Sequence, residues 1–202
     1  MNEEIVVLDF ETTGMQADFC RVIEVGAVLV REDEIVDTFS ELMNPGQRIP
    51  GFIQQLTGIS NAMIAGKPSP EEVMVSLAEF VGDRPILAHN ASFDKRFYIA
   101  EMNRANIDVS NQFMCSLMLA RRLVPDSPNH KLGTLVDYFD VRTADFNAHR
   151  ALDDATATAR VWMKLRETLA KMIGRNDISL EPFFKLQKRS KKQVPAFIAS
   201  LR

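Results

Sequence analysis

The chain has 202 residues, of which 46% are hydrophobic and 25% charged, and its formal net charge at pH 7 is -3. This length and composition suit one folded domain with a sizeable core, with or without a short appendage, and they exclude an intrinsically disordered chain. No stretch reaches the roughly 18 apolar residues of a membrane span, and the acidic start MNEE differs from a signal peptide, so we expect a cytoplasmic protein without membrane attachment.

The first predicted strand, within residues 6–14 (VVLDFETTG), ends in two acids. The alternation of side chains along a strand places Asp9 and Glu11 on the same face as Ile5 and Val7. Two carboxylates therefore converge at one end of a buried strand, which is unfavourable unless one is protonated or a cation lies between them. A divalent metal ion is the simplest such cation.

The elements that follow alternate between strands and helices. We expect a strand hairpin at 21–30 and 34–44, short helical pieces at 53–70, a helix at 69–82, a short buried strand at 85–90, a helix at 91–105, a strand running into a helix at 112–123, a short helix at 131–140 and a long helix from near Asn147 to Gly174. This order predicts an α/β domain with three layers.

Charge divides the chain in two. Residues 175–202 contain seven Lys or Arg and two acids, a balance of +5, whereas the rest carries 17 basic and 25 acidic residues, a balance of -8. An acidic body disfavours a large electrostatic surface for nucleic acid, although a local basic segment can still hold phosphate groups. We therefore predict a domain over residues 1–174 and a basic C-terminal tail over 175–202.

Two predicted helices carry acids near their starts. Asp94 lies in the first turn of the helix after LAHN, where the ordinary interpretation is a carboxylate that stabilises the helix dipole. In HRALDDA, the helical period places Asp153 on the solvent face and Asp154 on the core face, where an unpaired carboxylate is costly. His149 is expected at the start of this helix, after an Asn147 cap, as a neutral imidazole able to accept a proton.

Three segments together resemble the motifs of one known family. DFETTG, HNASFD and HRALDDA are similar, in order and spacing, to the three motifs of the DEDDh (DnaQ-like) 3'-5' exonucleases, and QLTGIS and KLGTL between them also fit, so that the resemblance covers about residues 4 to 172. The resemblance implies a ribonuclease H-like fold with a central mixed sheet of about five strands between helices. It implies metal binding by Asp9, Glu11, Asp94 and Asp154, and a general base at His149.

The resemblance also suggests contacts with the terminal nucleotide. It assigns them to residues of three short segments, which are Thr12, Thr13, Gly14, Leu56, Thr57, Ile59, His89, Asn90 and Phe93. For the middle segment a structural interpretation stays open, because Leu56 and Ile59 suit a core, and Thr57 suits a helix cap.

Four carboxylates suit two divalent cations, Mg²⁺ or Mn²⁺, about 3.5 to 4 Å apart, which can clamp the attacking and leaving oxygens of a phosphodiester. Zinc is not expected, because Cys20 and Cys115 are the only cysteines and the three histidines lie far apart, so both thiols are expected to be reduced.

We expect an exonuclease that acts on single-stranded 3' ends of DNA, in proofreading or repair, with a polymerase as a candidate partner. An exoribonuclease that trims RNA is the alternative within this class, because the catalytic centre does not itself read the 2'-hydroxyl. A non-catalytic module that binds nucleic acid or a polymerase is the alternative outside it, and would be marked by the loss of one acid or of His149; all five residues are present. The sequence does not indicate an oligomeric state.

Overall fold

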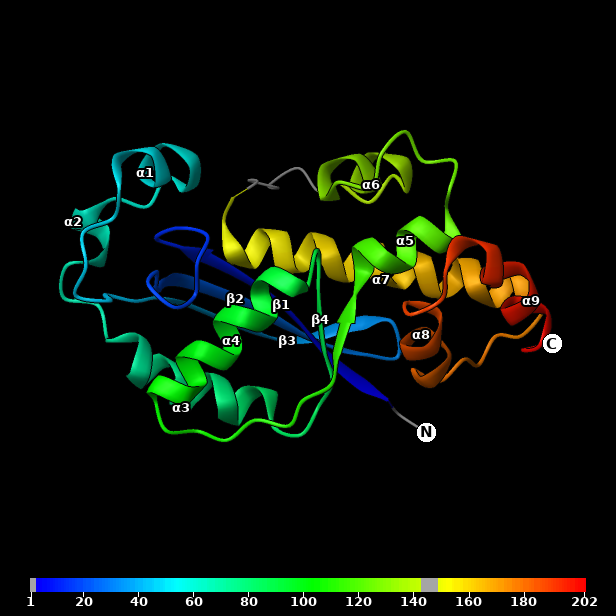
Figure 1. The fold of residues 1–202 in the computed structure, drawn as a ribbon, viewed down its shortest axis with the longest axis horizontal. Helices are drawn as coiled ribbons and strands as arrows, with labels where there is room; N and C mark the ends of the chain where they lie inside the picture. Colours follow the sequence, from blue (N-terminus) through cyan, green and yellow to red (C-terminus); the bar gives the residue numbers. More distant parts are fainter. Residues whose placement is uncertain (1–2, 143–148) are drawn as a thin grey trace.

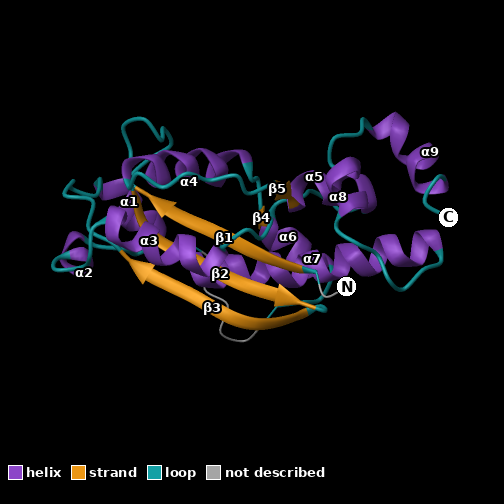
Figure 2. Cartoon of the chain, turned by 90° about the horizontal axis from the view of Figure 1, so that it is seen from below, coloured by secondary structure: helices purple, strands orange, loops and turns teal. Residues whose placement is uncertain are grey.

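The computed structural model describes residues 3–142 and 149–202, and at its centre lies a mixed five-stranded sheet in the order β3-β2-β1-β4-β5 (Figures 1 and 2). The strands are β1 (Glu4–Thr12), β2 (Val22–Arg31), β3 (Glu34–Leu42), β4 (Ile86–Ala88) and β5 (Phe113–Cys115). β1, β2 and β3 are antiparallel neighbours, whereas β4 runs parallel to both β1 and β5. The predicted α/β fold with a mixed sheet of about five strands is confirmed.

Helices cover both faces of this sheet (Figure 2). They are α1 (Gly51–Thr57), α2 (Asn61–Ile64), α3 (Pro70–Val81), α4 (Ser92–Arg104), α5 (Ser116–Leu123), α6 (Leu132–Tyr138), α7 (Ala151–Ile173), α8 (Glu181–Leu186) and α9 (Val194–Ala199), with a short 3-10 helix, η1 (Lys191–Gln193), before α9. None of the helices in the two described ranges is long and apolar enough to cross a lipid bilayer.

The alternation of side chains along β1 separates two hydrophobic cores. Ile5 and Val7 pack with residues of α5, α6 and α7 on one face of the sheet. Val6 and Leu8 pack with residues of α3 and α4 on the other face. Asp9 and Glu11 continue the row of Ile5 and Val7, so the two acids leave the sheet on the side that α7 covers.

The long helix α7 ends as predicted but begins later. Gly174 has φ 73, and its N–H donates to the carbonyl of Ala170, as expected of a C-terminal cap. The predicted cap Asn147 lies outside the described residues, and the helix begins at Ala151 with Arg150 in the cap position. His149 has φ 67, a left-handed conformation that does not continue into a right-handed helix. The prediction that His149 lies at the start of α7, just after a cap, is therefore corrected: it precedes the cap.

The segment after α7 folds back onto the domain. Its buried apolar side chains, which belong to the core beside α5 and α7, are Ile178, Leu180, Phe183, Leu186 and Val194. The Gln187 side chain accepts a hydrogen bond from the N–H of Cys115 at 2.9 Å and donates one to the carbonyl of Phe113 at 3.1 Å. The tail thereby covers the edge of β5.

Candidate active site

Three elements bring four carboxylates together near the end of β1. Asp9 and Glu11 lie on one face of β1, Asp94 lies in the first turn of α4, and Asp154 lies in the first turn of α7. Asp94 is 2% exposed, and its Oδ1 accepts a hydrogen bond of 3.2 Å from the backbone N–H of Phe10. Because Phe10 stands between the two acids of β1, this bond fixes Asp94 next to both of them.

His149 lies beside this cluster. One ring nitrogen of His149, one carboxylate oxygen of Glu11 and one of Asp154 all lie within 4.8 Å of one another. The backbone N–H of His149 also donates to Asp154 Oδ2 at 3.0 Å. The imidazole is exposed, so solvent reaches its ring beside the carboxylates.

Asp153 and Asp154, adjacent in the sequence, face different surroundings. One carboxylate oxygen of Asp154 lies within 4.8 Å of one of Glu11, whereas Asp153 lines a separate hollow together with Val136 and Arg160. The helical period therefore identified correctly which of the two acids faces the cluster.

A glycine in β2 brings α7 close to these acids. Gly26 pairs with Asp9 in the sheet, and a Cβ atom at this position would lie 2.1 Å from the backbone nitrogen of Leu152 and 2.2 Å from the carbonyl carbon of Ala151. Such contacts are too short for any other residue, so the backbone of α7 packs directly on the backbone of β2. Asp154 reaches the acids of β1 because of this close approach.

Glu24 and Arg150 form an ion pair that also holds the start of α7 against β2, and the sequence analysis identified neither of them. Glu24 pairs with Glu11 across the sheet and is 2% exposed. Its carboxylate accepts hydrogen bonds from Arg150 at 2.7 and 3.1 Å and from the backbone N–H of Ala151 at 3.0 Å. The sequence did contain two signals of a special position in this strand, a single acid and a single glycine inside the apolar run VIEVGAVLV.

Burial changes the protonation of the clustered acids. It raises the pKa of Glu11 to about 8, with further contributions from Asp154, Glu24 and Asp94, and it raises the pKa of Asp94 to about 7. Burial also raises the pKa values of Asp9 and Asp154, and for Asp9 the charge of Asp94 adds to this effect. Without a cation the cluster retains protons near neutral pH, and hard oxygen donors of this kind suit Mg²⁺ or Mn²⁺.

The turn after β1 frames one side of the cluster. Thr12 Oγ1 donates to the carbonyl of Gly14 at 2.6 Å, and Thr13 Oγ1 accepts from the N–H of Arg21 at 2.9 Å. Both threonines are buried, and a Cβ atom on Gly14 would lie 2.7 Å from Cys20 Sγ. These side chains are thus occupied in holding the turn, which gives them a structural role whether or not a ligand contacts its backbone.

The three residues expected from the LTGI segment are separated by burial. Leu56 is 53% exposed, whereas Ile59 is fully buried in a small core with Ile53 and its neighbours. Thr57 Oγ1 donates to the carbonyl of Ile53 at 3.0 Å and accepts from the N–H of Ile59 at 3.1 Å. Leu56 alone of the three offers an exposed apolar surface, whereas Thr57 and Ile59 are buried.

The motif after β4 contains two half-buried residues, His89 and Phe93, and one exposed residue, Asn90. His89 Nδ1 lies 2.9 Å from Ser116 Oγ, and His89 Nε2 lies 3.0 Å from the carbonyl of His130. Burial lowers the pKa of His89 to about 4, so the ring is neutral and joins β4 to α5. Asn90 is exposed with φ 63, and Phe93 is half-buried with its ring tilted by 48° to that of Phe97, at 4.9 Å between ring centres.

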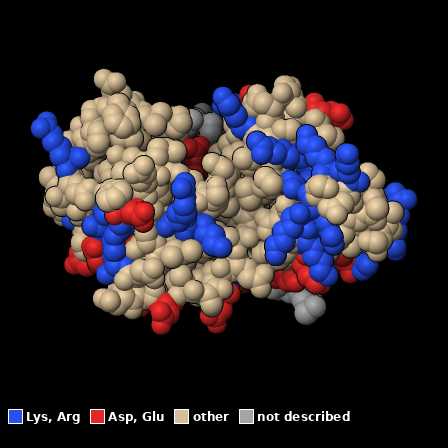
Figure 3. Space-filling model, viewed as in Figure 1, with Lys and Arg blue, Asp and Glu red and all other residues tan. Residues whose placement is uncertain are grey.

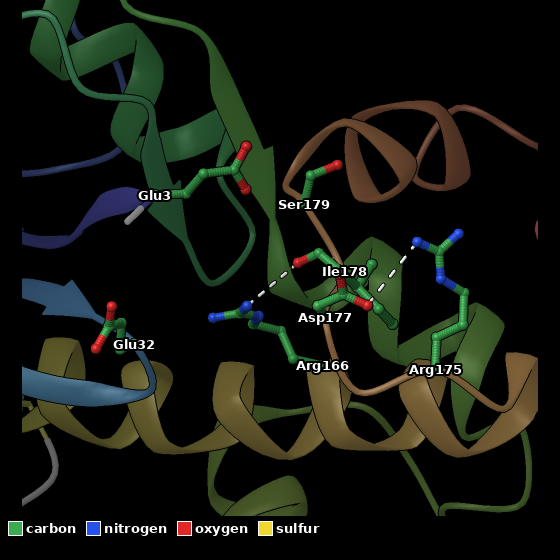
Figure 4. Close-up of a pocket in the computed structure, with 7 residues that line it drawn as sticks. All are labelled: Glu3, Glu32, Arg166, Arg175, Asp177, Ile178 and Ser179. Carbon is green, nitrogen blue, oxygen red and sulfur yellow. Dashed lines mark hydrogen bonds and ion pairs between the residues drawn. The ribbon is translucent and has the colours of Figure 1, made fainter. Parts of the chain in front are cut away.

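A separate hollow of about 280 Å³ lies at the opposite end of β1 (Figure 4). Side chains of both signs line it, among them Glu3, Arg166 and Arg175. Arg166 donates to the carbonyl of Ile178 at 3.2 Å, and Arg175 lies 3.8 Å from Asp177 (Figure 4). None of the residues expected from the motifs lines this hollow, so it is distinct from the acid cluster.

Comparison with known proteins agrees with this geometry. The sequence model of the RNase T family, described as exonuclease, matches residues 6–162. The chain belongs to this exonuclease family. Its resemblance to the DEDDh, DnaQ-like branch, predicted from three motifs, is therefore confirmed, as is the reaction class of a phosphodiester hydrolase.

Two relatives are DNA polymerase III proteins. The exonuclease chain is 39% identical over 176 residues to the DNA polymerase III PolC-type of Caldanaerobacter subterraneus subsp. tengcongensis, a match that covers 87% of this chain but only 12% of that protein. It is 38% identical over 167 residues to the DNA polymerase III subunit epsilon of Aquifex aeolicus, covering 81% of each. The chain thus spans a small part of the PolC-type relative and most of the epsilon subunit.

A solved structure confirms the fold of the exonuclease domain. Exonuclease X, solved in complex with 5' overhanging duplex DNA, superimposes with a TM-score of 0.73 at 26% sequence identity. The match covers 91% of this chain and 99% of that one. The ribonuclease H-like arrangement implied by the motifs is therefore the observed one.

Proposed function

We propose that this protein is a metal-dependent 3'-5' exonuclease that removes nucleoside monophosphates from single-stranded 3' ends of DNA. The observation that carries the proposal is the convergence of Asp9, Glu11, Asp94 and Asp154, with the exposed ring of His149 beside them. The relatives among DNA polymerase III proteins favour DNA over RNA, and they favour a proofreading or repair role with a polymerase as partner.

In the proposed reaction, water attacks the terminal phosphorus and the bond from that phosphorus to the 3'-oxygen breaks. His149 takes the proton that the water loses, and the leaving 3'-oxygen takes up a proton from solvent. The products are a nucleoside 5'-monophosphate and a strand shortened by one nucleotide that ends in a 3'-hydroxyl. Glu24 and Arg150 position His149 and Asp154 for this step, because they hold the start of α7 against β2.

The four acids would hold two divalent cations, Mg²⁺ or Mn²⁺, which supply charge neutralisation at the phosphate and a more acidic water. The raised pKa values support this assignment, since burial, with the neighbouring carboxylates adding to it for Asp9 and Glu11, makes the ionised acids costly without cations. Around them, Leu56 and Asn90 offer exposed contacts to the terminal nucleotide, and Phe93 borders the same region.

The adjacent acids of α7 provide a matched test. Asp154→Asn should reduce Mg²⁺-dependent hydrolysis by about 10²-fold or more, because it removes one ligand charge at the reaction centre, whereas Asp153→Asn should retain activity near that of the unmodified protein. The assay follows end-labelled single-stranded DNA, duplex DNA and RNA with Mg²⁺, Mn²⁺ or EDTA.

Three results would contradict the proposal: hydrolysis that persists in EDTA, shortening from the 5' end, or greater loss from Asp153→Asn than from Asp154→Asn. Faster shortening of RNA than of DNA would replace the proposed substrate by RNA. Thermal melting of both variants shows that each one is folded.

A further inference from the structure

Basic side chains gather on one side of the molecule. Figure 3 shows Lys and Arg concentrated over α5 and the segment from α8 to α9, in its right half. We call the following six residues the basic face: Arg121, Arg122, Lys188, Arg189, Lys191 and Lys192. Arg122 joins the two parts of this face, because its Nε donates to the carbonyl of Arg189 at 2.9 Å.

The charges of the basic face have no counter-charge among residues 3–142 and 149–202. In the described part of the chain, no ion pair involves any of the six, although Lys185 pairs with Glu181 at 2.7 Å. By contrast, Lys164 and Lys171 on α7 both pair with Glu167, at 3.0 and 2.5 Å. Like charges held together without counter-charges repel one another, so a surface of this kind favours a polyanion.

The basic face is built on an ordered support. Phe183, Leu186 and Val194 are buried in the core, so the intervening basic residues lie on a folded segment rather than a free tail. The guanidinium of Arg189 lies 5.2 Å from the ring centre of Phe197, which further restricts it. Charges that are already positioned lose less conformational entropy when they bind phosphate groups.

The basic face is continuous with the candidate active site through α5. Ser116, the first residue of α5, contacts His89 at the end of β4, at 2.9 Å from Oγ to Nδ1. Arg122 follows six residues later, a distance of about 9 Å along the helix. A strand with its 3' end at the acids can therefore follow α5 towards this face.

We propose that the basic face binds the phosphate groups of the substrate strand on the 5' side of its terminal nucleotides. This proposal rests on the proposed exonuclease function and adds a second region of contact, one that reads charge and not base identity. It predicts that long strands are preferred over short ones and that this preference weakens as salt is added.

The test compares two full-length variants that each lose three positive charges. The first is Lys188→Gln/Lys191→Gln/Lys192→Gln on the basic face, and the control is Arg160→Gln/Lys164→Gln/Lys171→Gln on α7. Binding of a fluorescent oligothymidine of about 16 nucleotides is measured in EDTA over a range of salt. Hydrolysis of the same oligomer and of a thymidine dinucleotide is measured with Mg²⁺.

The basic-face variant should bind the oligomer more weakly, and its salt slope should fall by about 2, at about 0.7 for each phosphate group that is no longer neutralised. Its kcat/KM should fall for the oligomer and stay unchanged for the dinucleotide. A variant with Arg at the same three positions keeps the positive charges and should show the salt slope of the unmodified protein. An unchanged slope, or an equal loss in the α7 control, would overturn the proposal. If the unmodified protein hydrolyses neither substrate, the proposed function fails. The comparison of binding by the two variants still decides whether the basic face binds phosphate groups.

Discussion

The carboxyl group of Glu11 retains a proton at a pH where an exposed glutamate would be ionised. Burial, together with the charges of Asp154, Glu24 and Asp94, raises its pKa from 4.5 to about 8. Asp94, whose pKa is raised from 3.8 to about 7, is likewise affected mainly by burial. These groups bind protons more tightly in the folded than in the unfolded chain, so in the absence of metal their contribution to stability depends on pH.

The metal-free protein should become less stable as the pH rises from about 5 to 9. The contribution of Glu11 and Asp94 is fully present below their unfolded pKa values of about 4 and is lost as the pH passes through the folded values. Thermal melting in EDTA across this range measures the effect. Glu11→Gln should raise the melting temperature at pH 8 by several degrees and make the melting temperature depend less on pH. Glu181→Gln, at an exposed site, serves as the control.

Addition of Mg²⁺ should reverse the loss of stability at pH 8, because the cation compensates the ionised acids. A metal-free melting temperature that rises steadily from pH 5 to 9 would contradict the electrostatic description of the cluster.

At the scale of single residues, the sequence predicted the clustered acids better than the residues that hold them in place. Asp9 and Glu11 follow from strand alternation, and Asp154 follows from the helical period, because both patterns are local. The partnership of Glu24 with Arg150 depends on the register of β2 against β1 and on the approach of α7, which connect residues more than 100 positions apart. No local pattern contains that information.

Among the elements, α7 is the one whose placement determines the site. Its first turn lies on Gly26, while the Glu24 carboxylate accepts the N–H of Ala151 and so acts as a cap supplied by another strand. The sequence rules expected a cap from a neighbouring residue, Asn147, and for this reason placed the start of the helix too early. By contrast, α3 begins as predicted, because its capping box between Ser69 and Glu72 is local.

Gly26→Ala should displace the start of α7 and reduce activity strongly. The added methyl group would meet backbone atoms of α7 at 2.1 to 2.4 Å, and backbone cannot rotate away as a side chain can. We expect a loss of about 1 to 3 kcal/mol in the free energy of unfolding and at least a tenfold loss in kcat. Urea unfolding and the exonuclease assay measure the two effects.

Gly133→Ala is the matched control, since a Cβ atom at this helical position would meet nothing within 4 Å. It should retain activity and be as stable as the unmodified protein or slightly more so. Full activity in Gly26→Ala would show that α7 can shift without moving Asp154 out of the cluster.

For the molecule as a whole, the charge boundary near residue 174 in the sequence does not coincide with a boundary of the core. The basic tail carries Phe183, which is fully buried and lies 4.6 Å from Trp162 between ring centres. The charge pattern and the apolar groups of the tail were readable from the sequence, whereas the surface on which the tail docks was not, because short apolar groups such as EPFF do not specify the surface that they will meet.

Replacement of Phe183 measures how far the tail supports the domain. Phe183→Ala should lower the free energy of unfolding by about 3 to 5 kcal/mol, as for other fully buried phenylalanines. Phe184→Ala, which changes the adjacent and only half-buried ring, should have a clearly smaller effect. Equal and small losses in the two variants, measured by urea unfolding, would mean that the tail is only loosely attached.

The hydrogen bonds of Gln187 to β5 have a consequence for how this protein behaves in concentrated solution. β5 is an outer strand of the sheet, and the side-chain amide of Gln187 occupies the N–H of Cys115 and the carbonyl of Phe113 as a neighbouring strand would. Free groups of this kind on an outer strand are sites where a second molecule can add a strand and begin aggregation. The tail therefore acts as a built-in protection against self-association at this edge of the sheet.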